Sequence, residues 1–146
     1  MIQICNLSLF SPSSAGPVAL RVRQASVPVV EDQECSARIN NVTERLFILP
    51  VSSFCAGGEL GNDACTGDGG SGLVCQSEGF YELTGLVSWG TFFCWEKSVL
   101  SAIKTISSIS SINVGFGCGR NGVPGVYAKV SSFVGWINQI VSTNSN

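Results

Sequence analysis

Short apolar runs bounded by turn-forming residues restrict what this chain can fold into more than any other feature. Gly, Pro, Asn and Ser clusters separate the runs, a pattern typical of an all-β barrel or sandwich. Pairs such as Gly57-Gly58 and Asn121-Gly122 favour turns in which positive φ is easy. The predicted strands are Arg21–Val29, Ser53–Ala56, Gly72–Gln76, Tyr81–Trp89 and Gly125–Lys129.

Two segments have helical character. Glu31–Ile39 is expected to form a short helix. Near the end of the chain, Phe133, Trp136, Ile137 and Ile140 recur at helical spacing, and Ser131 or Ser132 is the expected N-cap. The pattern therefore predicts a small β-barrel that ends in an amphipathic helix.

The Ser- and Ile-rich segment 91–115 fits neither a strand nor a long helix, because its apolar residues recur every third position. We interpret it as an irregular insertion without function. A short helix is a second possibility for this segment. Translated intron or a faulty gene model is another explanation for it and for residues 1–15.

Seven cysteines in 146 residues indicate disulfides and an oxidising compartment, and the odd number leaves one thiol unpaired within the chain. With no Cys-x-x-Cys pair and no histidine, neither a structural zinc site nor a cofactor is expected. Asn41-Val42-Thr43 and Asn6-Leu7-Ser8 match the glycosylation sequon, and Asn41 is the candidate site.

Charge and hydropathy limit the classes of binding partner that the chain can be expected to have. The formal net charge is −2, so neither nucleic acid nor an anionic membrane is an expected partner. Charged residues make up 12% of the chain and hydrophobic ones 45%, which indicates a bland surface or one covered by another protein. No apolar run is long enough for a transmembrane helix. The first residues lack the features of a secretion signal, so a fragment is expected.

Four runs resemble the trypsin-like serine protease family: VPVVEDQEC, FCAGGELGNDACTGDGGSGLVC, GLVSWG and GCGRNGVPGVYAKVSSFVGWI. The resemblance implies the C-terminal half of a two-barrel fold, that is, one Greek-key β-barrel with a C-terminal helix. It divides the chain into an uncertain segment 1–15 and a partial domain 16–146 with an insertion at 91–115. The barrel that supplies the family's catalytic histidine and aspartate has no counterpart in this chain.

The family's nucleophile motif is altered. Its Gly-Asp-Ser-Gly-Gly-Pro reads Gly-Asp-Gly-Gly-Ser-Gly here, which puts Gly69 at the nucleophile position and Gly67, Asp68 and Gly69 in the oxyanion turn. Ser71 is not a displaced nucleophile, because Cys65 and Cys75 keep the family's spacing. Without a nucleophile or a general base, the chain is predicted to be inactive.

The resemblance also assigns a specificity pocket. Asp63 corresponds to the carboxylate that selects Arg or Lys, Ser88-Trp89-Gly90 to the strand beside the substrate, and Gly125 to the opposite wall. The alternative for Asp63 is a solvated turn residue. The family buries the carboxylate of Asp68 against a new N-terminus that is missing here, so Asp68 is expected to be exposed, readily protonated or paired otherwise.

Disulfide pairs follow from the same resemblance. Cys35–Cys55 and Cys65–Cys118 correspond to family disulfides, and Cys5 lies at about the right distance to pair with Cys75. The Gly-Trp-Gly expected after Cys5 is absent. Cys94, inside the insertion, is the remaining thiol.

The glycine in the nucleophile motif resembles in particular the non-catalytic serine protease homologues of arthropods. This implies a secreted binding protein, a cofactor or decoy in an extracellular cascade such as prophenoloxidase activation, with proteases or zymogens as partners. Self-association through the barrel face is also expected. The alternatives are an active endopeptidase of trypsin specificity and a truncated gene product without independent function.

Overall fold

The structure is a computed structural model that describes residues 2–9, 22–43, 46–59, 63–64, 68–89 and 122–145. Within these ranges, two strands precede a helix, four strands follow it, and two helical elements come last. The strands are β1 (Ile4–Leu9), β2 (Arg23–Val30), β3 (Ser53–Ala56), β4 (Gly72–Ser77), β5 (Phe80–Trp89) and β6 (Gly125–Lys129). The helical elements are α1 (Asp32–Thr43), the 3₁₀ turn η1 (Val130–Phe133) and α3 (Val134–Asn144).

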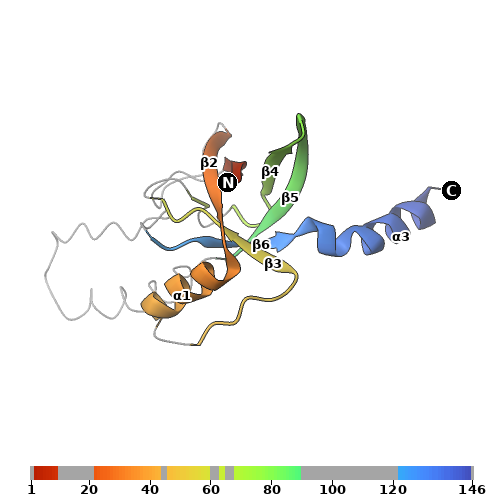
Figure 1. The fold of residues 1–146 in the computed structure, drawn as a ribbon. Helices are drawn as coiled ribbons and strands as arrows, with labels where there is room; N and C mark the ends of the chain where they lie inside the picture. Colours follow the sequence, from red (N-terminus) through yellow and green to blue (C-terminus); the bar gives the residue numbers. More distant parts are fainter. Residues whose placement is uncertain are drawn as a thin grey trace, which may run out of the picture.

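The described strands close into an antiparallel barrel in the order β1-β2-β3-β6-β5-β4 (Figure 1). Closure depends on β1, which pairs with β2 along one side and with β4 along the other. Since β4 returns to lie beside β1, the first four strands have the spatial order of a Greek key. The predicted barrel with a C-terminal helix is confirmed.

β1 lies in the segment to which the sequence pattern assigned no strand. Its burial alternates, with Cys5, Leu7 and Leu9 pointing into the barrel. The run of six residues is too short to be distinguished from a loop by periodicity alone. It forms a strand because two neighbouring strands satisfy its backbone hydrogen bonds, and this pairing is a tertiary property.

The barrel interior forms the main core. Its buried residues alternate along each strand, as the period of two in a β-strand requires. They are Cys5, Leu7, Leu9, Ala25, Val27, Phe54, Ala56, Leu73, Cys75, Val87 and Tyr127. The disulfide Cys5–Cys75 lies inside this core, between residues that face each other across β1 and β4 with their Cα atoms 4.2 Å apart.

A second cluster holds α1 on the outside of the barrel. Ile39 of α1 packs with Val30 and Val126, and all three are buried. The disulfide Cys35–Cys55 links α1 covalently to β3. Both disulfides join pairs that the family resemblance implies, whereas Cys65, Cys118 and Cys94 lie outside the described residues. The helix extends to Thr43, beyond the predicted end at Ile39.

α3 leaves the barrel after η1 and projects away from it (Figure 1). None of its residues is buried. The predicted serine N-cap is wrong: Ser131 and Ser132 lie inside η1, and Phe133 precedes α3 without a capping side-chain hydrogen bond. Several large apolar side chains are exposed on this helix and on Phe133, which precedes it. On the helix they are Val134, Trp136, Ile137, Ile140 and Val141. Among the described residues, no helix is long and apolar enough to cross a membrane.

Candidate functional site

The nucleophile motif forms a tight turn at Asp68–Ser71. The Ser71 amide donates to the Asp68 carbonyl oxygen at 2.9 Å, which makes Gly69 and Gly70 the central residues. Gly70 has a φ of 82°, as the third position of a type II turn requires. Backbone hydrogen bonds of 2.9 Å from Gly70 to Val87 and from Val87 to Ser71 fix the turn against β5.

At the position that the family motif assigns to the nucleophile, the turn carries a glycine. Gly69 is exposed, and a Cβ built at this position would meet no atom within 4 Å. The space that a serine side chain would need is therefore present, but the side chain is missing. Ser71 is only 8% exposed, so its hydroxyl is poorly placed to attack a substrate.

Asp68 is completely buried, so the expectation that it is exposed is wrong. Its negative charge contributes to a raised pKa of the Tyr127 hydroxyl, which places the two groups within electrostatic reach of each other. The third residue of the predicted oxyanion turn, Gly67, lies outside the described residues.

Asp63 is the second acidic group of the site and is partly buried in the connection between β3 and β4. Its Oδ1 accepts hydrogen bonds from the Ala64 amide at 2.7 Å and from the Tyr127 hydroxyl at 3.4 Å. The Gly58 backbone contributes a further hydrogen bond. These donors define the position of the carboxylate, and the alternative of a solvated turn residue does not describe it.

Two glycines make room for this carboxylate. A Cβ at Gly57 would lie 3.3 Å from the carboxylate oxygens of Asp63, and one at Gly125 would lie 3.1 Å from Oδ1. Both distances are shorter than ordinary van der Waals contact, so larger residues would push Asp63 aside. Asp63 and Gly125, 62 positions apart in the sequence, are thus brought together by the pairing of β3 with β6.

Tyr127 is held in place by the barrel core. Its ring is fully buried and stacks on Phe54 with centroids 5.8 Å apart. Phe54 in turn fills the space above Gly85, where a Cβ would approach its ring to 2.7 Å. The hydroxyl therefore reaches Asp63 from a rigid support.

Burial dominates the electrostatics. Desolvation raises the pKa of Asp63 from 3.8 to about 6, although its hydrogen bonds favour the charged form. Desolvation, together with the nearby charge of Asp63, also raises the pKa of Tyr127, so the hydroxyl keeps its proton and acts as a donor. A partly buried carboxylate of this kind is stabilised by a cation, and a planar guanidinium or an ammonium group has the right charge.

The other predicted site residues are distributed as follows. Ser88 is exposed on β5, and the backbone of Trp89 pairs with Val126 on β6. Gly90 lies outside the described residues. Asn41 is exposed near the end of α1.

Sequence reasoning missed the role of Tyr127. The residue was included only as part of a strand, two positions after Gly125. Its position inside a β-strand did carry a signal, since a tyrosine that faces a barrel interior needs a hydrogen-bond partner for its hydroxyl. The pattern contained no information on which residue that partner is.

A closed Greek-key barrel with a glycine turn on one edge and a C-terminal helix corresponds to one half of a trypsin-like protease domain. Residues 11–112 match the protein family described as Trypsin. The chain therefore belongs to the trypsin family, as the sequence motifs indicate.

Among the relatives of this chain, some are named as inactive and others carry names that do not state whether they are active. The chain is 56% identical over 131 residues to Protein masquerade of Drosophila melanogaster, covering 90% of this chain and 10% of that protein. It is 40% identical over 124 residues to Inactive CLIP domain-containing serine protease A3 of Aedes aegypti, covering 82% and 21%. Identity to Phenoloxidase-activating factor 2 of Galleria mellonella is 34% over 125 residues, covering 83% and 33%. The chain spans a third or less of each of these relatives.

Proposed function

We propose that this chain is a catalytically inactive trypsin-family protein that acts outside the cell by binding other proteins. The observation that supports the proposal is Gly69, which the family motif aligns with the nucleophile and which lies in a hydrogen-bonded turn with open space beside it. A backbone without a reactive side chain cannot form the acyl intermediate on which serine proteases depend.

The site around Asp63 is proposed to have a binding role. In this proposal, the carboxylate of Asp63 pairs with an arginine or lysine side chain of a partner, and Gly125 leaves space for that side chain. Ser88-Trp89-Gly90 would lie along the backbone of the bound segment. The partner is held but not cleaved, because no group is positioned to attack it.

A cofactor or decoy role in an extracellular protease cascade is the biological setting that we propose. The names of two relatives support it, one called inactive and the other a phenoloxidase-activating factor. Proteases or zymogens, whose processing sites commonly contain basic residues, would suit a pocket with an acidic base. The two disulfides suit an oxidising, extracellular compartment.

Self-association through the exposed barrel face stays a prediction, and we propose the apolar surface of α3 as a second place of self-association. Trp136 is 62% exposed and Val141 is 59% exposed, on a helix that buries no residue. Apolar surface of this extent marks a place where another protein binds.

The test separates binding from catalysis on the whole chain. Binding of p-aminobenzamidine, a fluorescent amidinium that mimics the arginine cation, is measured at pH 8 together with hydrolysis of an arginine p-nitroanilide. We expect binding without hydrolysis, and a loss of affinity of at least about tenfold in Asp63→Asn. Glu82→Gln, a change of an exposed carboxylate on β5, is the matched control.

Two outcomes would contradict the proposal. Hydrolysis by the wild-type chain that a serine-directed inhibitor abolishes would show that an endopeptidase survives. If the wild-type chain and Asp63→Asn bind p-aminobenzamidine with equal affinity, Asp63 does not bind the cation and this part of the proposal is wrong. The endopeptidase alternative has little support, because the nearest serine, Ser71, is buried.

A further inference from the structure

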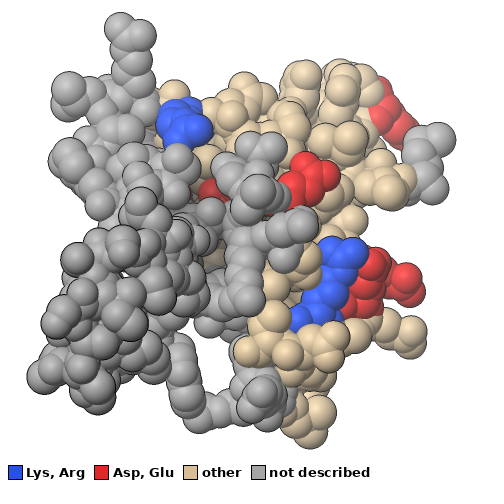
Figure 2. Space-filling model, turned by 90° about the vertical axis from the view of Figure 1, so that its left-hand side faces the viewer, with Lys and Arg blue, Asp and Glu red and all other residues tan. Residues whose placement is uncertain are grey.

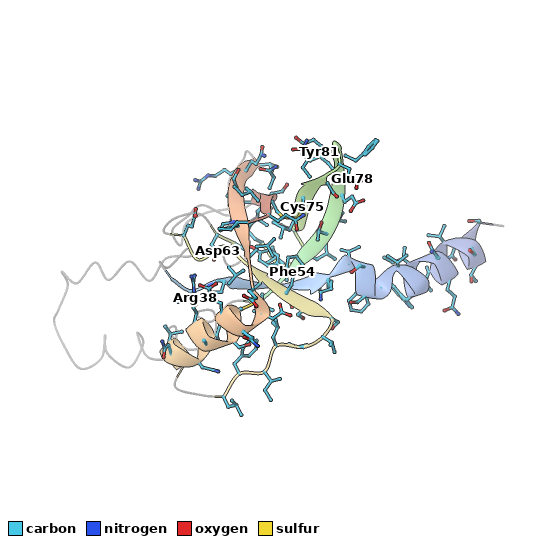
Figure 3. All side chains as sticks on the ribbon, viewed as in Figure 1. Arg38, Phe54, Asp63, Cys75, Glu78 and Tyr81 are labelled. Carbon is cyan, nitrogen blue, oxygen red and sulfur yellow. A yellow bond between two sulfur atoms is a disulfide. The ribbon has the colours of Figure 1, made fainter. Side chains whose placement is uncertain are left out.

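A groove on the outer face of the barrel is separate from the Asp63 cluster. It has a volume of about 410 Å³ and is lined from β1, β2, β4 and β5, with Val22 at its border. None of its lining residues contacts Asp63 in the site described above. Figure 3 shows Tyr81 at the far end of the β4–β5 hairpin, well apart from Asp63 and Arg38.

The strand register explains how the groove forms. Asn6 and Ser8 point outward because they alternate with the buried Cys5, Leu7 and Leu9. Asn6 lies opposite Val74 on β4, and Ser8 lies opposite Gln24 on β2. The groove thus combines polar side chains of β1 and β2 with the apolar side chain of Val74 on β4.

Hydrogen-bond donors dominate the lining. The Ser26 hydroxyl donates to Asn6 Oδ1 at 3.1 Å, which leaves the amide NH₂ of Asn6 as the donor available to a ligand. Ser8 and Gln24 add further donors, and Arg23 adds a guanidinium. Such a surface suits a ligand that is rich in acceptors.

The positive charge of Arg23 makes the groove suited to an anionic ligand. Among the lining residues that the structure describes, Arg23 is the only charged one, and it forms no ion pair with any other described residue. By contrast, Arg38 is engaged by Glu34 one helical turn away. The chain as a whole carries a net charge of −2, and Figure 2 shows one place where basic and acidic side chains of the described residues lie side by side. An exposed guanidinium without an ion pair among the described residues is therefore a local exception on an acidic protein.

We propose that this groove binds an acidic side chain of an extended peptide segment in a partner protein. The carboxylate would pair with the fork of Arg23, and the amides of Asn6 and Gln24 would bond the peptide backbone. Val74 and the 67% exposed ring of Tyr81 would receive an apolar neighbour. Tyrosine and arginine are also the residues that most often dominate protein interfaces.

A single cation favours a peptide over a sulfated polysaccharide. Binding to a polyanion gains affinity from several cations along its length, and the described part of the lining offers one. One carboxylate matches one guanidinium. The proposal concerns a different surface from the Asp63 pocket and does not depend on it.

The experiment uses fluorescence anisotropy of a labelled peptide in which valine and glutamate alternate, with the glutamine version as the neutral probe. We expect the glutamate peptide to bind at least about tenfold more tightly than the neutral one. Arg23→Gln should abolish that difference, and Tyr81→Ser should weaken both peptides. Arg38→Gln, which removes a cation from α1, should leave the affinity unchanged. Thermal unfolding of each variant establishes that it is folded.

Several results would overturn the proposal. These are equal affinity for the two peptides, no binding up to about 1 mM, or equal losses in Arg23→Gln and Arg38→Gln. Tighter, Arg23-dependent binding of a heparin-derived oligosaccharide would assign the groove to a polysaccharide instead.

Discussion

The hydroxyl of Tyr127 donates a hydrogen bond to Oδ1 of Asp63 across a distance of 3.4 Å, although 64 positions separate the two residues. Tyr127 cannot move away, because its ring stacks on Phe54 in the barrel interior. The Ala64 amide approaches the same oxygen at 2.7 Å. One carboxylate oxygen is therefore supported by two donors, and the site keeps its acidic group in a defined position.

Asp63 should make the protein less stable as the pH rises through about 6. Its folded-state pKa is about 6 against an ordinary value of 3.8, so between these values the folded chain binds the extra proton. The free energy of unfolding therefore falls with rising pH across this window, by roughly 3 kcal/mol at most. Urea unfolding from pH 4 to 8, compared with Asp63→Asn, measures this dependence. Parallel curves for the two proteins would refute the assignment.

Tyr127→Phe should shift the pH dependence of cation binding upward. The cation binds the ionised carboxylate, so affinity for p-aminobenzamidine should rise through pH 6 in the wild-type chain. The tyrosine hydrogen bond favours the ionised form, and its removal raises the pKa of Asp63 further. The midpoint of a binding titration should move to higher pH, with a loss of about 1 kcal/mol in stability. Tyr81→Phe, an exposed tyrosine, is the control, and a downward shift would contradict the geometry.

Serine should be tolerated at position 69 but not at position 70. A Cβ meets no atom within 4 Å at either glycine, but only Gly70 has a φ of 82°. Gly70→Ser should therefore cost about 1–2 kcal/mol of unfolding free energy, while Gly69→Ser should stay within about 0.5 kcal/mol. Gly69→Ser should not restore hydrolysis, because the chain contains no histidine to activate the serine. Measurable turnover of an arginine p-nitroanilide by this variant would show that another base exists.

Polar substitutions on α3 should reduce self-association without destabilising the barrel. Trp136→Gln combined with Ile140→Gln removes two exposed apolar side chains and keeps residues that suit a helix. The unfolding free energy of the monomer should change by less than about 1 kcal/mol, whereas Leu7→Ala in the core should lose about 2–5 kcal/mol. Analytical ultracentrifugation measures the association. Unchanged sedimentation of the double variant relative to a self-associating wild type would place the contact elsewhere.

The sequence by itself determined the fold class and most strand positions, and it predicts the loss of the nucleophile. β3 and β6 have the predicted bounds, because short apolar runs between turn residues carry local information. Gly69 is read directly from the motif, and the turn that holds it needs only adjacent residues. The pairing of Cys5 with Cys75 follows the family resemblance and is present in the structure.

Only the tertiary structure decided which distant groups meet. β1 becomes a strand through pairing with β2 and β4, and Asp63 meets Tyr127 because β6 runs beside β3. The burial of Asp68, which rules out exposure as one of the three alternatives stated for it, likewise depends on the packing around the turn. The helical pattern of α3 was visible in the sequence, but its lack of any buried residue was not. Periodicity reports local conformation, whereas burial, desolvation and hydrogen-bond partners depend on segments that only the closed barrel brings together.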